Sequence, residues 1–85
     1  MWFVDLDARA ARELRKLDRS AQQRVAAALD ALAVDPFAGD VKPLKGKAEA
    51  TYRRREGDYR IIFQLQADKV LVLVLAIGHR REVYR

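Results

Sequence analysis

The sequence contains no cysteine, which excludes a disulfide framework and any cysteine-based metal site. It contains one histidine, which excludes a histidine-rich metal site. The longest apolar run, from Val70 to Ile77, is far shorter than the roughly 20 residues that a membrane-spanning helix needs. No basic segment precedes a long apolar run near Met1, so we expect no signal peptide, no membrane association and a cytoplasmic location.

The composition is that of a globular and basic chain. Its 85 residues are expected to form a single domain over residues 1–85, with 51% apolar and 34% charged residues. Lys and Arg number 17 against 12 Asp and Glu, which gives a net charge of +5. A basic balance suggests a polyanionic partner, either nucleic acid or an acidic protein, although many small domains are basic without using their charge.

The first half of the chain predicts a short strand followed by two helices. Residues 2–6 alternate as a strand does, and we expect this strand at or next to a sheet edge. Asp7 can cap a helix that ends near Leu17, and Ser20 with Gln23 has the form of a capping box for a second helix ending near Val34. The short connection between them favours an antiparallel helix hairpin.

The second half predicts a loop over residues 41–50 and then antiparallel strands. Residues 43–47 lack the glycine spacing of a phosphate-binding P-loop. Strands are expected over residues 51–55 and 59–66, joined by a tight turn. Residues 69–77 are apolar on both faces, which predicts a central strand that is covered on both sides or nearly so and ends at Gly78. Residues 80–84 can form a last short strand. The fold class is therefore α+β, with the N-terminal strand and the helix hairpin packed on a mainly antiparallel four-stranded sheet.

Arginine residues bracket the apolar strands and give the clearest functional signal. Alternation along the strands allows one face of the sheet to collect five side chains: Arg53, Arg55, Arg60, Arg80 and Tyr84. Guanidinium groups bind phosphate oxygens in pairs, and a tyrosine ring can stack on an unpaired base. Taken singly, each arginine is better explained as a solvated strand residue. As a set they carry clustered positive charge, which disfavours folding unless an anion uses it.

The remaining candidates are weaker. No pair of carboxylates suggests a metal-dependent nuclease, and Ser20 is explained as a helix cap. His79 has the only side chain whose ordinary pKa lies near neutrality, so it is either a general acid or base or a turn residue after Gly78.

In this order and spacing, four segments together resemble the RelE/ParE toxin superfamily, the toxin half of bacterial type II toxin–antitoxin modules. The resemblance covers essentially the whole chain and rests on the helix hairpin ending at Asp35-Pro36, on residues 42–46, on residues 52–63 and on residues 78–84. It implies the α+β fold described above. RelE-like members are ribosome-dependent endoribonucleases that cut mRNA, whereas ParE-like members inhibit DNA gyrase and lack the nuclease residues.

By resemblance to the RelE-like branch, the catalytic roles fall on Arg53, Arg55, Arg60, Arg80 and Tyr84, with Arg81 able to take the place of Arg80. Further RNA contacts are expected from Lys42, Lys45, Lys47, Arg54, His79 and Arg81. The implied reaction is attack of a ribose 2′-OH on the adjacent phosphate, with no metal and no cofactor. Arg60 and Arg80 would bind the phosphoryl oxygens, and Tyr84 would stack on or orient a base.

The chain departs from RelE at one point that matters for this chemistry. RelE carries lysines where this chain has Arg53 and Arg55, and arginine does not release its proton. Proton transfer would then fall to Lys45, Lys47, His79 or the ribosome. The implied partners are a cognate antitoxin, the ribosome and mRNA. Two alternatives stay open: a non-enzymatic gyrase inhibitor of the ParE type, and a weakened toxin that mainly binds its antitoxin.

Overall fold

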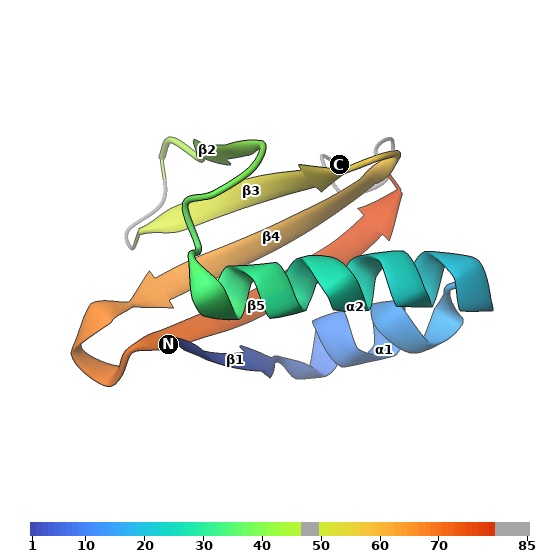
Figure 1. Cartoon of the computed structure of the whole chain (residues 1–85), viewed down its shortest axis with the longest axis horizontal. Coiled ribbons are helices and arrows are strands. Elements are labelled where there is room, and N and C mark those ends of the chain that lie inside the picture. Colours follow the sequence, from blue (N-terminus) through green and yellow to red (C-terminus); the bar gives the residue numbers. More distant parts are fainter. Residues whose placement is uncertain (47–49, 80–85) are drawn as a thin grey trace.

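The chain folds into one five-stranded sheet with two helices on one face, in a computed structural model that describes residues 1–46 and 50–79 (Figure 1). The strand order is β1-β5-β4-β3-β2; β1 runs parallel to β5, and all other neighbours are antiparallel. The elements in chain order are β1 (Phe3–Leu6), α1 (Ala8–Lys16), α2 (Arg19–Val34), β2 (Val41–Pro43), β3 (Thr51–Glu56), β4 (Tyr59–Gln66), the 3₁₀ helix η1 (Ala67–Lys69) and β5 (Leu71–His79). The predicted α+β class is confirmed, with β1 at a sheet edge.

The sheet has five strands where the sequence predicted four, because part of the expected loop pairs with β3. In β2, Val41 lies opposite Arg54 and Pro43 lies opposite Tyr52. A proline cannot donate to a strand ladder, but it is tolerated in an edge strand such as this one. The prediction of a loop was therefore wrong for residues 41–43.

Both helices begin at an aspartate. The Asp7 side chain accepts a hydrogen bond from the Ala10 N–H at 2.9 Å, which confirms the first predicted cap. The capping box at Ser20 was wrong, because the Asp18 side chain accepts from the Ala21 N–H at 2.8 Å and Ser20 lies inside α2. An aspartate two residues earlier can fill the same role and lengthens the helix.

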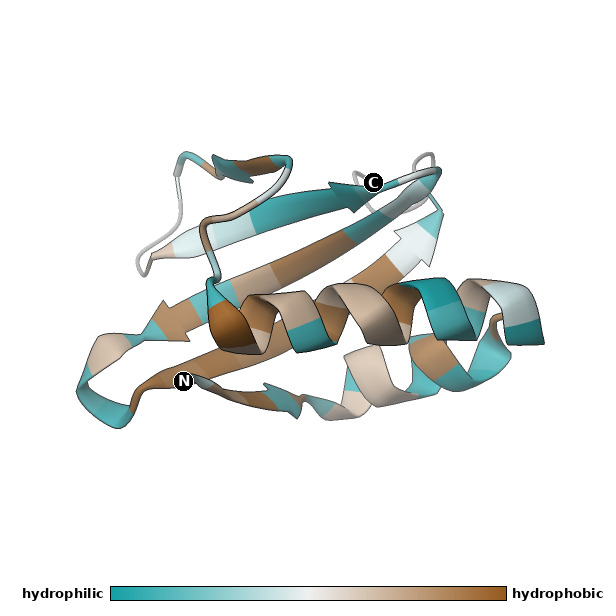
Figure 2. Cartoon of the chain, in the orientation of Figure 1, coloured by the Kyte–Doolittle hydropathy of each residue, from teal (hydrophilic) through white to brown (hydrophobic). Residues whose placement is uncertain are grey.

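The hydrophobic core lies between the helices and one face of the sheet. Val25 and Leu32 of α2 are fully buried against a sheet face that includes Ile61, Phe63 and Val74. Figure 2 shows the same arrangement as apolar colour along β4 and β5 behind the helices, whereas β3 is largely hydrophilic. Each large side chain buried in this way contributes about 1.5–3 kcal/mol, so this layer is the main source of stability.

The strand β5 is fully covered on one side and only partly on the other, which is less than the sequence predicted. Val72 and Val74 are fully buried, but Leu71 and Leu73 on the opposite side are only partly buried. The register shifts so that Ile62 pairs with Ala76 and Phe63 with Val74, which leaves an extra residue in β5. Such a bulge bends and twists a strand locally.

The end of β5 also differs from the prediction. Gly78 was expected to end the strand, but it is buried inside β5, which continues to His79. Pairing with β1 ends at Val74, and beyond it the Ile77 N–H donates to the Glu13 carboxylate of α1 at 2.9 Å. A helix side chain thus caps this backbone group where β1 has ended. Within residues 1–46 and 50–79, no helix is long and apolar enough to cross a membrane.

Candidate nucleic-acid interface

Four basic side chains share the sheet face that the helices leave uncovered. The register sets Lys42 opposite Arg53, and Arg55 opposite Arg60. Paired residues point to the same side of a sheet, and residues two apart on a strand do so as well. Because Ile61 and Phe63 point into the core, Arg60 points away from it. We call Lys42, Arg53, Arg55 and Arg60 the arginine face.

The arginine face is graded from buried to exposed. Arg60 is only 3% exposed and Arg53 only 7%, so neither is the freely solvated strand residue that the sequence allowed. The Arg55 side chain is 40% exposed, and Lys42 is exposed at the sheet edge. Arg60 pairs on its other side with Gly78 of β5, which has no side chain to compete for space there. The face therefore offers two buried guanidinium groups, those of Arg53 and Arg60, and two cationic groups that solvent can reach, the Arg55 guanidinium and the Lys42 ammonium.

Asp40 is a member of this site that sequence reasoning missed. Arg53 Nη1 donates to the Asp40 carboxylate Oδ1 at 3.0 Å and to the Asp40 carbonyl oxygen at 3.2 Å. Arg55 Nε lies 3.7 Å from Asp40 Oδ2. The hydrogen bond from Arg53 and the nearby positive charges of Arg53, Arg55 and Lys42 hold the pKa of Asp40 below its ordinary value, against a smaller opposing effect of burial. Only the pairing of β2 with β3 could have revealed this contact.

Arg54, predicted to contact RNA, lies on the other side of β3. Its Nη1 donates to the Ala38 carbonyl oxygen at 2.9 Å, and its Nη2 lies 3.4 Å from Glu56 Oε1. The guanidinium also fits closely over Gly39, where an added Cβ would lie 3.1 Å from Arg54 Nη1. Arg54 therefore holds the turn before β2, and the structure separates it from the arginine face.

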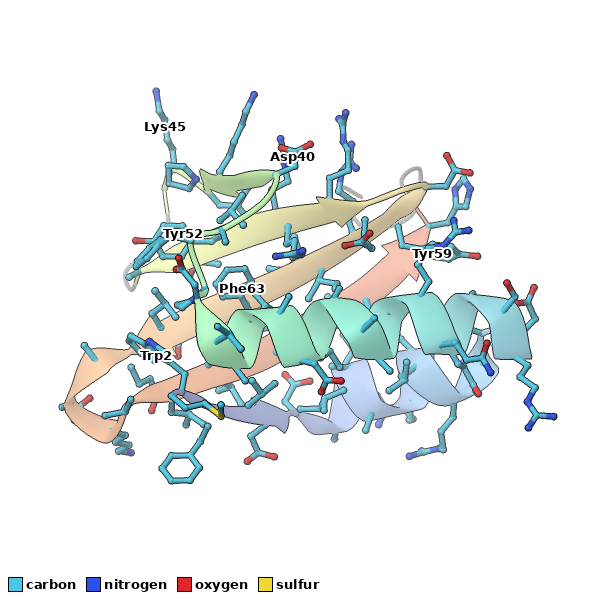
Figure 3. All side chains as sticks on the ribbon, viewed as in Figure 1. Trp2, Asp40, Lys45, Tyr52, Tyr59 and Phe63 are labelled. Carbon is cyan, nitrogen blue, oxygen red and sulfur yellow. The ribbon has the colours of Figure 1, made fainter. Side chains whose placement is uncertain are left out.

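His79 is separated from the arginine face as well. It pairs with Tyr59, their rings meet edge to face at 6.0 Å, and Tyr59 packs against the core (Figure 3 labels Tyr59). Both side chains line an open cavity of about 440 Å³ with residues of α1 such as Glu13 and Lys16. His79 is therefore on the helix side of the sheet.

Of the remaining predicted site residues, the structure describes Lys45 only. Lys45 is exposed and points away from the sheet at its outer rim (Figure 3). The predictions for Lys47, Arg80, Arg81 and Tyr84 fall outside the described residues. In the part of the chain that the structure describes, no three His, Asp or Glu side chains are grouped so that they could hold a metal ion.

The sequence is similar both to a family model and to individual toxins. The family model described as ParE toxin of type II toxin-antitoxin system, parDE, matches residues 4–84. The mRNA interferase toxin RelE of Escherichia coli is 30% identical over 86 aligned positions, covering 98% of this chain and 90% of that protein. The toxin RelG of Mycobacterium tuberculosis is 32% identical over 44 residues, which are 52% of this chain and 51% of RelG.

Comparisons of the structure agree with those of the sequence. The isolated E. coli RelE toxin superposes with a TM-score of 0.76 at 31% identity, covering 99% of this chain and 92% of that one. A chain of the toxin-antitoxin complex RelBE2 from M. tuberculosis superposes with a TM-score of 0.83 at 26% identity, covering 93% of this chain and 98% of that one. From its sequence and its fold, the chain belongs to the RelE/ParE superfamily of toxins of type II toxin–antitoxin systems.

Proposed function

We propose that this toxin is a RelE-like, ribosome-dependent endoribonuclease that cuts mRNA and is neutralised by a cognate antitoxin. The observation that carries the proposal is the pairing of Arg55 with Arg60, which, with the pairing of Lys42 and Arg53, gathers four basic side chains on one uncovered face. Near-full-length similarity to a protein named as an mRNA interferase supports the same activity.

The chemistry proposed for this face is stabilisation of a phosphorane-like transition state. When a ribose 2′-OH gives its proton to a base and attacks the adjacent phosphate, negative charge builds on the phosphoryl oxygens. A 2′,3′-cyclic phosphate forms, the bond between phosphorus and the 5′-oxygen breaks, and the 5′-oxygen takes up a proton from an acid. Fixed guanidinium groups stabilise that charge without having to reorganise, so no metal is required. Arg53 and Arg60 are rigid enough for this role because both are buried. Arg80 and Tyr84 are proposed to complete the site from the C-terminal segment.

Proton transfer is the step for which the arginine face is least equipped. His79 lies on the helix side of the sheet and Lys45 lies at the outer rim. Arginine does not act as a base at neutral pH. We therefore propose that the ribosome, or the segments carrying Lys47 and Tyr84, provides the proton acceptor, which agrees with a requirement for the ribosome.

Exchange of Arg55 tests the proposal more cleanly than exchange of Arg60. Arg60 is 3% exposed, so Arg60→Ala puts the fold at risk, whereas Arg55 is partly exposed. We expect Arg55→Gln to reduce mRNA cutting on the order of a hundredfold, as removal of one transition-state donor does in other enzymes. Cutting is measured by primer extension on cellular mRNA after induction, and codon-phased cuts are expected for the wild type.

Arg12→Gln is the matched control, because it removes the same charge from an exposed position on α1. It should cut mRNA as the wild type does. Arg80→Ala should lose cutting while its circular dichroism spectrum is retained. If Arg55→Gln and Arg80→Ala both stay folded and fully active, these residues do not perform the reaction.

A second candidate function is inhibition of DNA gyrase, because the matching family model describes a ParE toxin. A ParE-like inhibitor would induce a DNA-damage response on expression and leave mRNA uncut. A weakened toxin that mainly binds its antitoxin would cause no growth arrest. The same induction experiment separates these outcomes from the proposed nuclease.

A further inference from the structure

A carboxylate occupies the place on the arginine face where a phosphate would be expected to bind. The two oxygens of Asp40 face two different guanidinium groups, with Oδ1 3.0 Å from Arg53 Nη1 and Oδ2 3.7 Å from Arg55 Nε. Two non-bridging phosphate oxygens would make the same kind of contact. In the free protein, an anion that belongs to the chain itself already holds these two arginines.

The backbone around Asp40 is held firmly while its side chain stays accessible. The Arg55 N–H donates to the Asp40 carbonyl oxygen at 2.9 Å, and Arg54 holds the preceding turn through the Ala38 carbonyl oxygen at 2.9 Å. Gly39 allows this turn, since its φ of +83° favours glycine. The Asp40 side chain is nevertheless 46% exposed. Rotation about its side-chain bonds can therefore withdraw the carboxylate from both arginines without moving the strand, while Arg53 Nη1 keeps its bond to the Asp40 carbonyl oxygen at 3.2 Å.

We propose that Asp40 is a built-in competitor of RNA, which holds Arg53 and Arg55 in the free toxin and is displaced by a backbone phosphate on binding. RNA as the ligand rests on the proposed function. Two arginines directly opposite on paired strands repel each other, as Arg55 and Arg60 do here. Asp40 offsets that repulsion when no ligand is bound, at the cost of competing with the ligand.

This role predicts opposite changes in stability and in affinity for Asp40→Asn. Asparagine keeps the shape of aspartate but removes the charge, so the variant should melt at a lower temperature than the wild type. The same change removes the ionised partner of Arg53 and Arg55, so the variant should bind RNA more tightly. A residue that only positions the two arginines would lower both quantities when exchanged.

The experiment measures binding of a short single-stranded RNA by fluorescence anisotropy at a series of salt concentrations. The RNA carries 2′-O-methyl groups, so it lacks the nucleophile and is not cut. We expect Asp40→Asn to bind about three- to tenfold more tightly at low salt. One further phosphate contact should steepen the slope of log affinity against log salt by about 0.7.

Glu56→Gln is the matched control, because it also removes one negative charge near β3. Unlike Asp40, Glu56 pairs with Arg54 on the helix side of the sheet. It should change affinity less than about twofold, since its effect is only a screened long-range charge. In the Arg55→Gln background, Asp40→Asn should raise the affinity for RNA much less than it does in the wild type, because one of the two arginines that Asp40 contacts is then absent.

Three results would overturn the inference: weaker or unchanged binding by Asp40→Asn, an equal gain in Glu56→Gln, or a gain that survives in the Arg55→Gln background. Failure of the proposed function appears differently. If the toxin never cuts mRNA but Asp40→Asn still binds RNA more tightly, this inference stands and the proposed nuclease activity is wrong. If the toxin cuts mRNA but Asp40→Asn does not bind RNA more tightly, the nuclease activity stands and this inference is wrong.

Discussion

The two faces of the sheet differ in chemistry although the same strands form both: one is apolar and buried, and the other carries positive charge. On the helix side, alternate residues such as Phe63 and Val74 are fully buried against α2. On the other side, β3 and β4 present arginines, of which Arg53 and Arg60 are buried without joining the apolar core. One face supplies stability by excluding water. The other collects like charges, which is tolerable because Asp40 partly neutralises them.

Phe63→Ala should have the largest effect, because it opens a cavity in the stabilising face. Phe63 is fully buried and stacks on Tyr52 with ring centroids 5.7 Å apart. We expect a loss of about 3–5 kcal/mol in the free energy of unfolding, measured by urea denaturation. Phe37→Ala is the control, because Phe37 also contacts Tyr52 but is 56% exposed. Similar losses in the two variants would contradict the view that burial of the Phe63 ring is what stabilises the fold.

Glu13→Ala should have an intermediate effect at the border between helix and sheet. The Glu13 carboxylate accepts from the Ile77 N–H at 2.9 Å and lies 3.4 Å from Arg9 Nε. Loss of this acceptor should cost about 1–2 kcal/mol and speed hydrogen exchange at the Ile77 amide. Glu13→Gln retains an acceptor and should cost less. An unchanged exchange rate at Ile77 in Glu13→Ala would show that this cap is not needed.

The smallest expected effect is a pH dependence on the arginine face. The pKa of Asp40 is held below its ordinary value of 3.8, chiefly by the hydrogen bond from Arg53, with further contributions from the charges of Arg53, Arg55 and Lys42. Ionised Asp40 therefore stabilises the fold above the ordinary pKa, and this contribution is lost as pH falls below it and through the lowered value.

Thermal melting of the wild type and of Asp40→Asn measures this contribution. The difference in Tm should be constant from about pH 7 to pH 5 and should shrink below about pH 4. A difference that grows towards acid would mean that Asp40 is not held in its charged form by the arginines.

Local patterns in the sequence were sufficient for both helices, for the strands β1, β3, β4 and β5, and for the inward faces of α2 and β4, but not for β2. Asp7 as a cap, the apolar stripe of α2 and the alternation in β4 each depend on neighbours within a few residues. The same alternation correctly separated Arg53 and Arg55 from Arg54. Predictions failed where two local solutions compete, as between Asp18 and Ser20 for the second cap.

The sequence by itself determined that basic residues would gather on a sheet of α+β type, because strand parity and helical periodicity follow from backbone geometry. Only the tertiary structure decided how that charge is held. Pairing of β2 with β3 brings Asp40 to Arg53 across 13 positions of the chain, and the end of β5 carries His79 to the helix side. Such contacts depend on strand register, which no short-range pattern encodes.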